Sequence, residues 1–167
     1  MRKTKNAVLA ALCAFSVLTL SACGAGDAAG PAPDFTLTAP DGKTVTLSSK
    51  KGHPVLLNFW ATWCDSCKEE LPALQSLQER SGGRFELLAV SVDDDAAKVV
   101  PPFAAAHKLN FPLLYADRRT MDAYAVRMLP TTFLISPDGT IARRYVGPLD
   151  ARAVENDILS LLNRRPS

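Results

Sequence analysis

Two cysteines, Cys64 and Cys67, have the residue type and the spacing needed for thiol–disulfide exchange. They follow the apolar run at 55–60 and open a segment whose apolar residues recur with helical spacing. On neighbouring parts of one helical turn their Cα atoms would be about 5–6 Å apart, which a disulfide can bridge. We therefore expect a buried strand that delivers the pair to the N-terminus of a helix, as in redox-active dithiols.

The first 22 residues do not have the pattern of a folded domain. Residues 1–5 are basic and residues 7–20 are almost wholly apolar. This pattern predicts a secretory signal, too short to span a membrane comfortably. The segment 20–23, Leu-Ser-Ala-Cys, resembles the lipobox of bacterial lipoproteins. The resemblance implies that Cys23 is acylated and begins the mature chain. An ordinary signal peptide and an uncleaved anchor are the alternatives, and all three place the domain outside the cytoplasm.

Charge and cysteine count narrow the function of the remaining chain. Residues 1–22 contain three of the 19 basic residues and none of the 17 acidic ones, so the rest has one more acidic than basic residue. We therefore expect no nucleic-acid partner. Without Cys13 and Cys23, only Cys64 and Cys67 remain. Because they enclose only two residues, their bridge would constrain the unfolded chain very little. A zinc site needs about four ligands, and the only histidines are His53 and His107, so we expect no metal and no other cofactor.

The order of the predicted elements indicates an α/β domain. Residues 23–33 are rich in Gly, Ala and Pro and predict a flexible tether, which leaves 34–163 as the domain. We expect a hairpin at 35–47, further strands at 55–60, 85–92, 111–115, 131–135 and 140–146, and helices after the cysteines, towards residue 107, at 119–125 and at 149–162. Thr62 is the expected N-cap of the helix that follows the cysteines, and Pro101 and Pro102 should break or restart the next one. This order predicts a central mixed β-sheet covered by helices on both faces.

The run at 58–72, Asn-Phe-Trp-Ala-Thr-Trp-Cys-Asp-Ser-Cys-Lys-Glu-Glu-Leu-Pro, resembles the active site of the TlpA/ResA-like thioredoxins. These are membrane-anchored thiol–disulfide oxidoreductases of the AhpC/TSA–redoxin-like superfamily. Residues 129–133 resemble their cis-proline segment, and 136–139 and 145–147 their terminal hairpin. The resemblance covers about 32–162 and implies a thioredoxin-like fold with an N-terminal β-hairpin and a central βα insertion. Two residues depart from common patterns: Ser66 replaces a frequent proline, and Asn58 replaces the proton-moving aspartate of classical thioredoxins.

The resemblance assigns roles to the residues around the cysteines. Cys64 is the expected attacking thiol and Cys67 the resolving thiol, so that the two form the redox-active disulfide. The helix N-terminus and Lys68 favour the Cys64 thiolate, whereas Asp65 opposes it.

The same comparison predicts how a substrate is bound. Pro130 is expected to be cis and packed opposite the cysteines. Leu129 and Thr131 then flank an exposed backbone that can pair with an extended substrate. Trp63 would offer an apolar contact surface.

Three acidic residues near the site have alternative assignments. ResA-like relatives use a buried acid near the strand after the active-site helix. Asp94 is the nearest match and Asp93 the second, and an acid that faces water at a helix N-terminus is the alternative. Glu70 is expected either to shape the helix or to lie on a solvated face.

These residues predict an extracytoplasmic protein-disulfide reductase, lipid-anchored on the periplasmic side of a bacterial membrane. The resemblance implies a membrane thiol donor of the DsbD/CcdA type. It also implies clients such as apocytochrome c, in cytochrome c maturation, or a copper-site assembly factor.

Two other functions compete with this prediction. A peroxiredoxin would have Pro and Thr or Ser where this chain has Leu57 and Ala61. A copper chaperone of the Sco type would use C-x-x-x-C with a histidine, for which His107 is the candidate.

Overall fold

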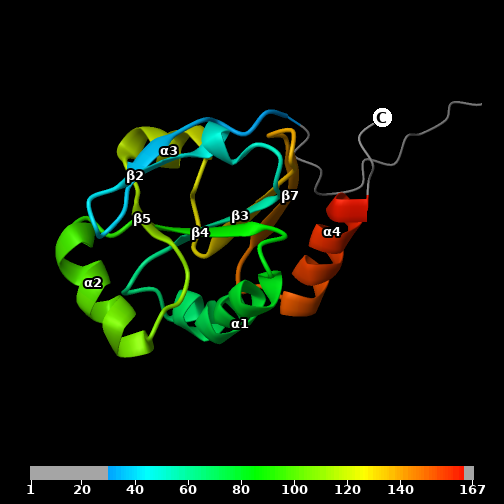
Figure 1. Cartoon of the computed structure of the whole chain (residues 1–167). Helices are drawn as coiled ribbons and strands as arrows, with labels where there is room; N and C mark the ends of the chain where they lie inside the picture. The colour runs from blue at the N-terminus through cyan, green and yellow to red at the C-terminus, as the bar shows by residue number, and fades with distance from the viewer. Residues whose placement is uncertain (1–29, 164–167) are drawn as a thin grey trace, which may run out of the picture.

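The central element of the computed structural model, which describes residues 30–163, is a seven-stranded sheet in the order β2-β1-β5-β4-β3-β6-β7 (Figure 1). The strands are β1 (Thr36–Thr38), β2 (Thr44–Thr46), β3 (Val55–Trp60), β4 (Glu86–Ser91), β5 (Leu113–Tyr115), β6 (Thr131–Ile135) and β7 (Ile141–Val146). The three central strands β3, β4 and β5 are parallel, whereas β1, β2, β6 and β7 pair antiparallel with their neighbours. The predicted mixed sheet with an N-terminal hairpin is confirmed.

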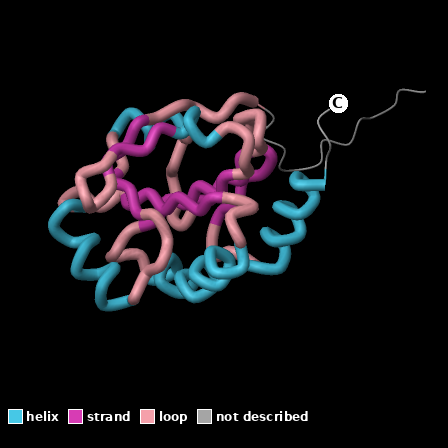
Figure 2. Tube along the Cα trace, viewed as in Figure 1, coloured by secondary structure: helices cyan, strands magenta, loops and turns pink. Residues whose placement is uncertain are grey.

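Helices cover both faces of this sheet, as Figures 1 and 2 show. They are α1 (Asp65–Ser81), α2 (Ala96–His107), α3 (Arg118–Ala123) and α4 (Ala151–Asn163), with a short 3-10 helix η1 (Leu47–Lys50). One core cluster joins the sheet to α1, α2 and α4, and a second joins its other face to η1 and the end of α3. The fold therefore has three layers, with the predicted helices on both sides.

Strand β3 is buried along its whole length because it lies between these two cores. Leu56 and Trp60 pack on the α1 side, whereas Leu57 and Phe59 pack on the other side. Successive side chains of a strand point to opposite faces, so Asn58 points to the α1 side with Leu56 and Trp60. The polar residue in this apolar run therefore faces the helix that contains the cysteines.

Helix α2 differs from the expectation, because it continues through Pro101 and Pro102 without a break. Both prolines are exposed, as are Ala97 and Lys98, whose carbonyl groups would otherwise accept their N–H bonds. Water can satisfy these carbonyls. Val100, fully buried on the opposite side, anchors the helix to the core.

The described domain begins earlier than the predicted boundary at residue 34. Pro31 forms a β-bridge with Thr140. Gly30 O accepts from Ile141 N–H at 2.9 Å, and Ala32 N–H donates to Gly139 O at 2.9 Å. The last residues assigned to the tether therefore pair with the turn between β6 and β7. The predicted signal, Cys23 and the first part of the tether lie outside the described residues.

Candidate active site

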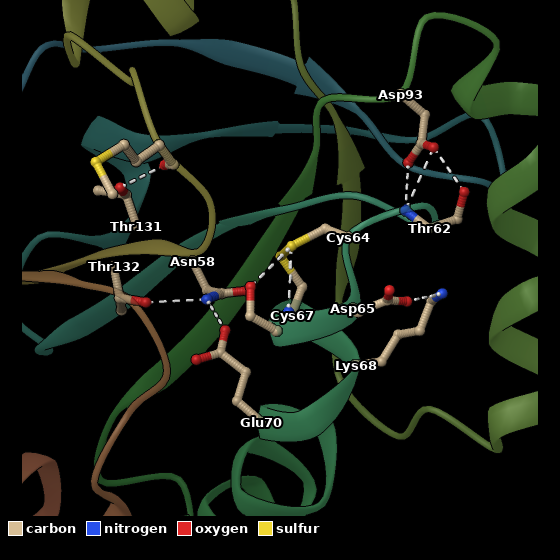
Figure 3. The surroundings of a disulfide bond; sticks show 12 residues. Asn58, Thr62, Cys64, Asp65, Cys67, Lys68, Glu70, Asp93, Thr131 and Thr132 are labelled. Carbon is tan, nitrogen blue, oxygen red and sulfur yellow. Dashed lines mark hydrogen bonds and ion pairs between the residues drawn. A yellow bond between two sulfur atoms is a disulfide. The ribbon is translucent and has the colours of Figure 1, made fainter.

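Cys64 and Cys67 form a disulfide at the N-terminus of α1, with their Cα atoms 5.3 Å apart (Figure 3). Cys64 is the N-cap residue of this helix, and its Sγ accepts a hydrogen bond from Cys67 N–H at 3.2 Å. Cys64 is 7% exposed, whereas Cys67 is fully buried. Thr62, which the sequence predicted as the N-cap, lies two residues before the N-cap in the structure. Because Cys64 is the more exposed residue of the two and its sulfur lies next to the free N–H groups of the helix, Cys64 is suited to be the nucleophile.

The two charged side chains next to the disulfide pair with each other. Lys68 Nζ lies 2.8 Å from Asp65 Oδ1, and this hydrogen bond lowers the pKa of Asp65. Lys68 and Asp65, whose charges were expected to act on the Cys64 thiolate in opposite directions, therefore form one exposed ion pair. Ser66, at the position of the family's frequent proline, places its Oγ 3.4 Å from Cys64 Sγ.

Glu70 is a buried acid, with 3% of its surface exposed, so a solvated face is excluded. Its Oε1 accepts from Asn58 Nδ2 at 2.7 Å, and its Oε2 accepts from Leu149 N–H at 3.0 Å. Burial raises the pKa of Glu70 to about 7, although these two hydrogen bonds act in the opposite direction. Residues three apart on a helix share a face, so Glu70 lies one turn beyond Cys67 on the same side of α1. The helical spacing of Cys67 and Leu74, both buried, could have identified Glu70 as an inward-facing residue.

Of the two acids after β4, Asp94 is exposed, as its water-facing alternative expected, whereas Asp93, the second match, is buried. Asp93 Oδ2 accepts from Thr62 N–H at 3.0 Å and from Ser91 Oγ at 2.8 Å, and its Oδ1 accepts from Thr62 Oγ1 at 2.6 Å. These bonds connect the end of β4 to the loop that leads into Cys64 (Figure 3). Asp93 therefore holds this loop, and Asp94 is not the buried acid that the resemblance implied.

The cis-proline segment lies beside the end of β3. The Leu129–Pro130 peptide is cis, as predicted. Strand β6 pairs with β3 so that Thr131 lies opposite Phe59, which places Pro130 next to the end of β3 that leads to the cysteines. Thr131 is fully buried, and its hydroxyl donates to Met128 O at 2.7 Å. The Thr131 side chain thus supports this loop and is not available to a substrate.

Three exposed apolar side chains flank this end of the sheet. Trp63, which precedes Cys64, is 66% exposed, and Met128 and Val146 are 64% and 52% exposed. Val146 lies opposite Thr131 in the β6–β7 pair. Of the three, only Trp63 was predicted. The positions of Met128 and Val146 depend on strand register, which no local pattern in the sequence reveals.

Known proteins resemble this chain in sequence and in fold. The sequence model of the AhpC/TSA family matches residues 28–144. The thiol-disulfide oxidoreductase ResA of Bacillus subtilis is 37% identical over 162 residues, which cover 93% of this chain and 89% of ResA.

Solved structures agree with the sequence relatives. StoA from Bacillus subtilis has a TM-score of 0.66 and 28% identity, over 75% of this chain and 96% of StoA. The exposed lipoprotein thioredoxin Etrx1 of Streptococcus pneumoniae has a TM-score of 0.66 and 27% identity, over 77% of this chain and 100% of Etrx1. With its thioredoxin-like fold and its Cys64–Cys67 pair, the chain belongs to the AhpC/TSA family and is a ResA-like thiol–disulfide oxidoreductase.

Proposed function

We propose that this oxidoreductase reduces disulfides of client proteins outside the cytoplasm, held at a bacterial membrane by a lipid on Cys23. The observation that carries the proposal is the asymmetric pair at the tip of α1, with Cys64 7% exposed and Cys67 fully buried one turn before the buried Glu70. The lipobox-like sequence at 20–23 supports the anchor. The similarity to Etrx1, which is named an exposed lipoprotein thioredoxin, supports both the anchor and the location.

In the first step, the reduced protein attacks the client. The Cys64 thiolate, favoured by the helix N-terminus, attacks one sulfur of the client disulfide. The bond between Cys64 and the client forms as the client S–S bond breaks. The second client sulfur leaves as a thiolate and takes a proton from water.

In the second step, Cys67 resolves this mixed disulfide. The Cys67 thiol gives its proton to the Glu70 carboxylate, and the resulting thiolate attacks Cys64 Sγ. The Cys64–Cys67 bond forms, and the first client sulfur leaves as a thiolate that is protonated by water. The client gains two electrons and becomes a dithiol, while the cysteine pair is oxidised. Glu70 suits this role because its pKa of about 7 lets it accept and release a proton near neutral pH.

The client would bind over the exposed apolar side chains next to Cys64. Trp63, Met128 and Val146 supply an apolar surface, and Leu129, which follows Met128, packs against the core. An extended client segment could pair with the backbone at Leu129. Apocytochrome c or a copper-site assembly factor are the candidate clients, and a membrane protein of the DsbD/CcdA type is the candidate electron donor.

A Cys67→Ser variant in the native host tests this proposal. Without the resolving thiol, the mixed disulfide on Cys64 persists, and non-reducing gels followed by mass spectrometry identify the trapped protein. A Cys64→Ser/Cys67→Ser double variant is the control and should trap nothing. Equal recovery with both variants would refute the mechanism, and a reduction potential near the −120 mV of strong oxidants would refute the proposed direction. Rapid peroxide consumption by Cys64 would favour the peroxiredoxin alternative.

A further inference from the structure

The side chain of Asn58 lies in the interior between Glu70 and Thr132 (Figure 3). Its Nδ2 donates to Glu70 Oε1 at 2.7 Å and to Thr132 Oγ1 at 2.9 Å. Asn58 and Thr132 are fully buried, and Glu70 nearly so. The Oδ1 of Asn58 is also buried, but it has no hydrogen-bond partner among the described residues. Buried acceptors without a partner are uncommon, so this one requires an explanation.

The hydrogen bonds of Glu70 fit only one of its two protonation states. Both Asn58 Nδ2 and Leu149 N–H donate to the carboxyl group. A carboxylate accepts both bonds, but a neutral carboxyl group carries a hydrogen that needs an acceptor. The backbone N–H of Leu149 can only donate. The Asn58 amide can change its role, because a half-turn exchanges its nitrogen and its oxygen.

Thr132 allows this half-turn, because a hydroxyl group can either accept or donate. In the orientation described, Thr132 Oγ1 accepts from Nδ2. After the turn, the Thr132 hydroxyl and the protonated Glu70 would both donate to Oδ1. The oxygen that now lacks a partner would then have two, and Nδ2 would move to the position that Oδ1 now occupies.

We propose that Asn58 is the positioning residue for Glu70 and that its amide turns over each time Glu70 gains or loses a proton. The buried carboxyl group would thereby keep a hydrogen bond to Asn58 in both states. The role of Glu70 as proton acceptor for Cys67 belongs to the proposed function. The rotation itself needs no client and can be tested in the oxidised protein.

Few other ionisable groups surround this site. Cys67, one turn earlier on α1, is in the disulfide and does not titrate. From β7, Tyr145 pairs in register with Thr132 and donates to Asp157 of α4 at 2.7 Å. Burial raises the pKa of Tyr145, so this tyrosine stays neutral over the range in which Glu70 titrates. A change near pH 7 at Asn58 in the oxidised protein would therefore report on Glu70.

The experiment is an NMR titration of the purified, oxidised full-length protein from pH 5 to pH 9. The Glu70 carboxyl carbon reports protonation. Nuclear Overhauser contacts from the Asn58 Nδ2 hydrogens to the Glu70 methylene and the Thr132 methyl report amide orientation. We expect these contacts above the Glu70 midpoint and their loss below it, with the same midpoint for both signals. Contacts that persist after Glu70 is protonated would overturn the proposal.

Two sets of variants complete the test. Glu70→Gln has no titrating group, so the Asn58 signals should no longer depend on pH in this range. Asn58→Ala removes the bond to Glu70 in both states, and because the bond to the charged carboxylate is the stronger one, the pKa of Glu70 should rise by about one unit, a tenfold change in proton affinity. Asn110→Ala is the matched control, because exposed Asn110 donates to Glu79 at 3.1 Å, and it should leave Glu70 unchanged.

Asn58→Ser provides a second measurement if Asn58→Ala does not fold. An unchanged Glu70 midpoint in whichever Asn58 variant folds would refute the role of Asn58. Failure of the Cys67→Ser trap would instead refute the proposed function.

Discussion

Glu70 is an ionisable residue at a position where an apolar side chain could be buried at a lower cost in free energy. Its carboxyl group lies in the core with two hydrogen-bond donors, one turn from the resolving cysteine. Burial of a carboxyl group favours its neutral form, which is why its pKa rises to about 7. A group with this pKa exchanges protons readily at neutral pH, which a residue kept only for packing would not do.

The first prediction concerns the stability contributed by this residue. The pKa of Glu70 is raised in the folded state from 4.5 to about 7, so the unfolded chain releases this proton at lower pH. The free energy of unfolding should therefore fall as pH rises from about 4.5 to about 7, by about 3 kcal/mol at about 1.4 kcal/mol per pKa unit. The free energy of unfolding of Glu70→Gln, measured with urea at pH 5 and pH 7.5, should lack this part of the decrease. Equal pH dependence in both proteins would contradict the raised pKa.

At the residue scale, the sequence predicted the chemistry better than its supporting groups. Cys64, Cys67 and the buried Trp60 could be predicted because spacing and apolar runs are local features. Which of Asp93 and Asp94 is buried could not be predicted, because the two are adjacent and a shift of one position changes which side chain points inward.

At the scale of elements, the loop between β3 and α1 is held by a residue from the neighbouring strand. Asp93 follows β4 and accepts three hydrogen bonds from Thr62 and Ser91 at 2.6–3.0 Å. Since Cys64 lies two residues after Thr62, these bonds fix the start of the helix that carries the nucleophile. The geometry of the site thus depends on the parallel pairing of β3 and β4.

The second prediction tests this loop. Asp93→Ala leaves the buried donors of Thr62 and Ser91 without an acceptor and should lower the free energy of unfolding by about 2 kcal/mol. It should also slow disulfide reduction, because the loop no longer holds Cys64 in one position. Asp94→Ala, one residue along and exposed, is the control and should change neither quantity. Chemical unfolding and an insulin-reduction assay measure both, and equal effects of the two variants would argue against the assigned contacts.

The elements were largely predictable, because their hydrophobic periods and turn residues are local. The sequence predicted the N-terminal hairpin and β3 on this basis. The uninterrupted α2 was not predicted, because the tolerance of Pro101 and Pro102 depends on which side of the helix faces water. That property is set by packing against the rest of the domain, as is the order of the strands.

On the scale of the whole molecule, exposed apolar side chains gather at the end of the sheet that carries the cysteines. Trp63, Met128 and Val146 come from three separate segments, and they lie at the same end of the sheet because β6 pairs with both β3 and β7. Apolar side chains grouped around a reactive site are typical of protein-binding surfaces.

The third prediction is that this surface binds protein clients. Trp63→Ala should raise the KM for a protein disulfide about tenfold, since tryptophans that become buried on binding often contribute most of the interface energy. Its rate with a small disulfide such as oxidised glutathione should stay close to that of the unchanged protein. Leu159→Ala, which removes an exposed apolar side chain from α4, is the control and should leave both substrates unaffected. A similar loss with both substrates would show that Trp63 acts on the cysteines and not on client binding.

The pairing of Pro31 with Thr140 places the start of the described chain beside the turn between β6 and β7. Residue Ile135, just before the β6–β7 turn, lies opposite Val55 at the start of β3, whereas the cysteines follow the other end of that strand. Six residues of extended chain separate these two ends by roughly 20 Å. With the proposed lipid on Cys23, the anchor would join the domain at the end of the sheet away from the sulfur atoms. Client binding at Cys64 would then take place at the end of the domain opposite to the point of attachment.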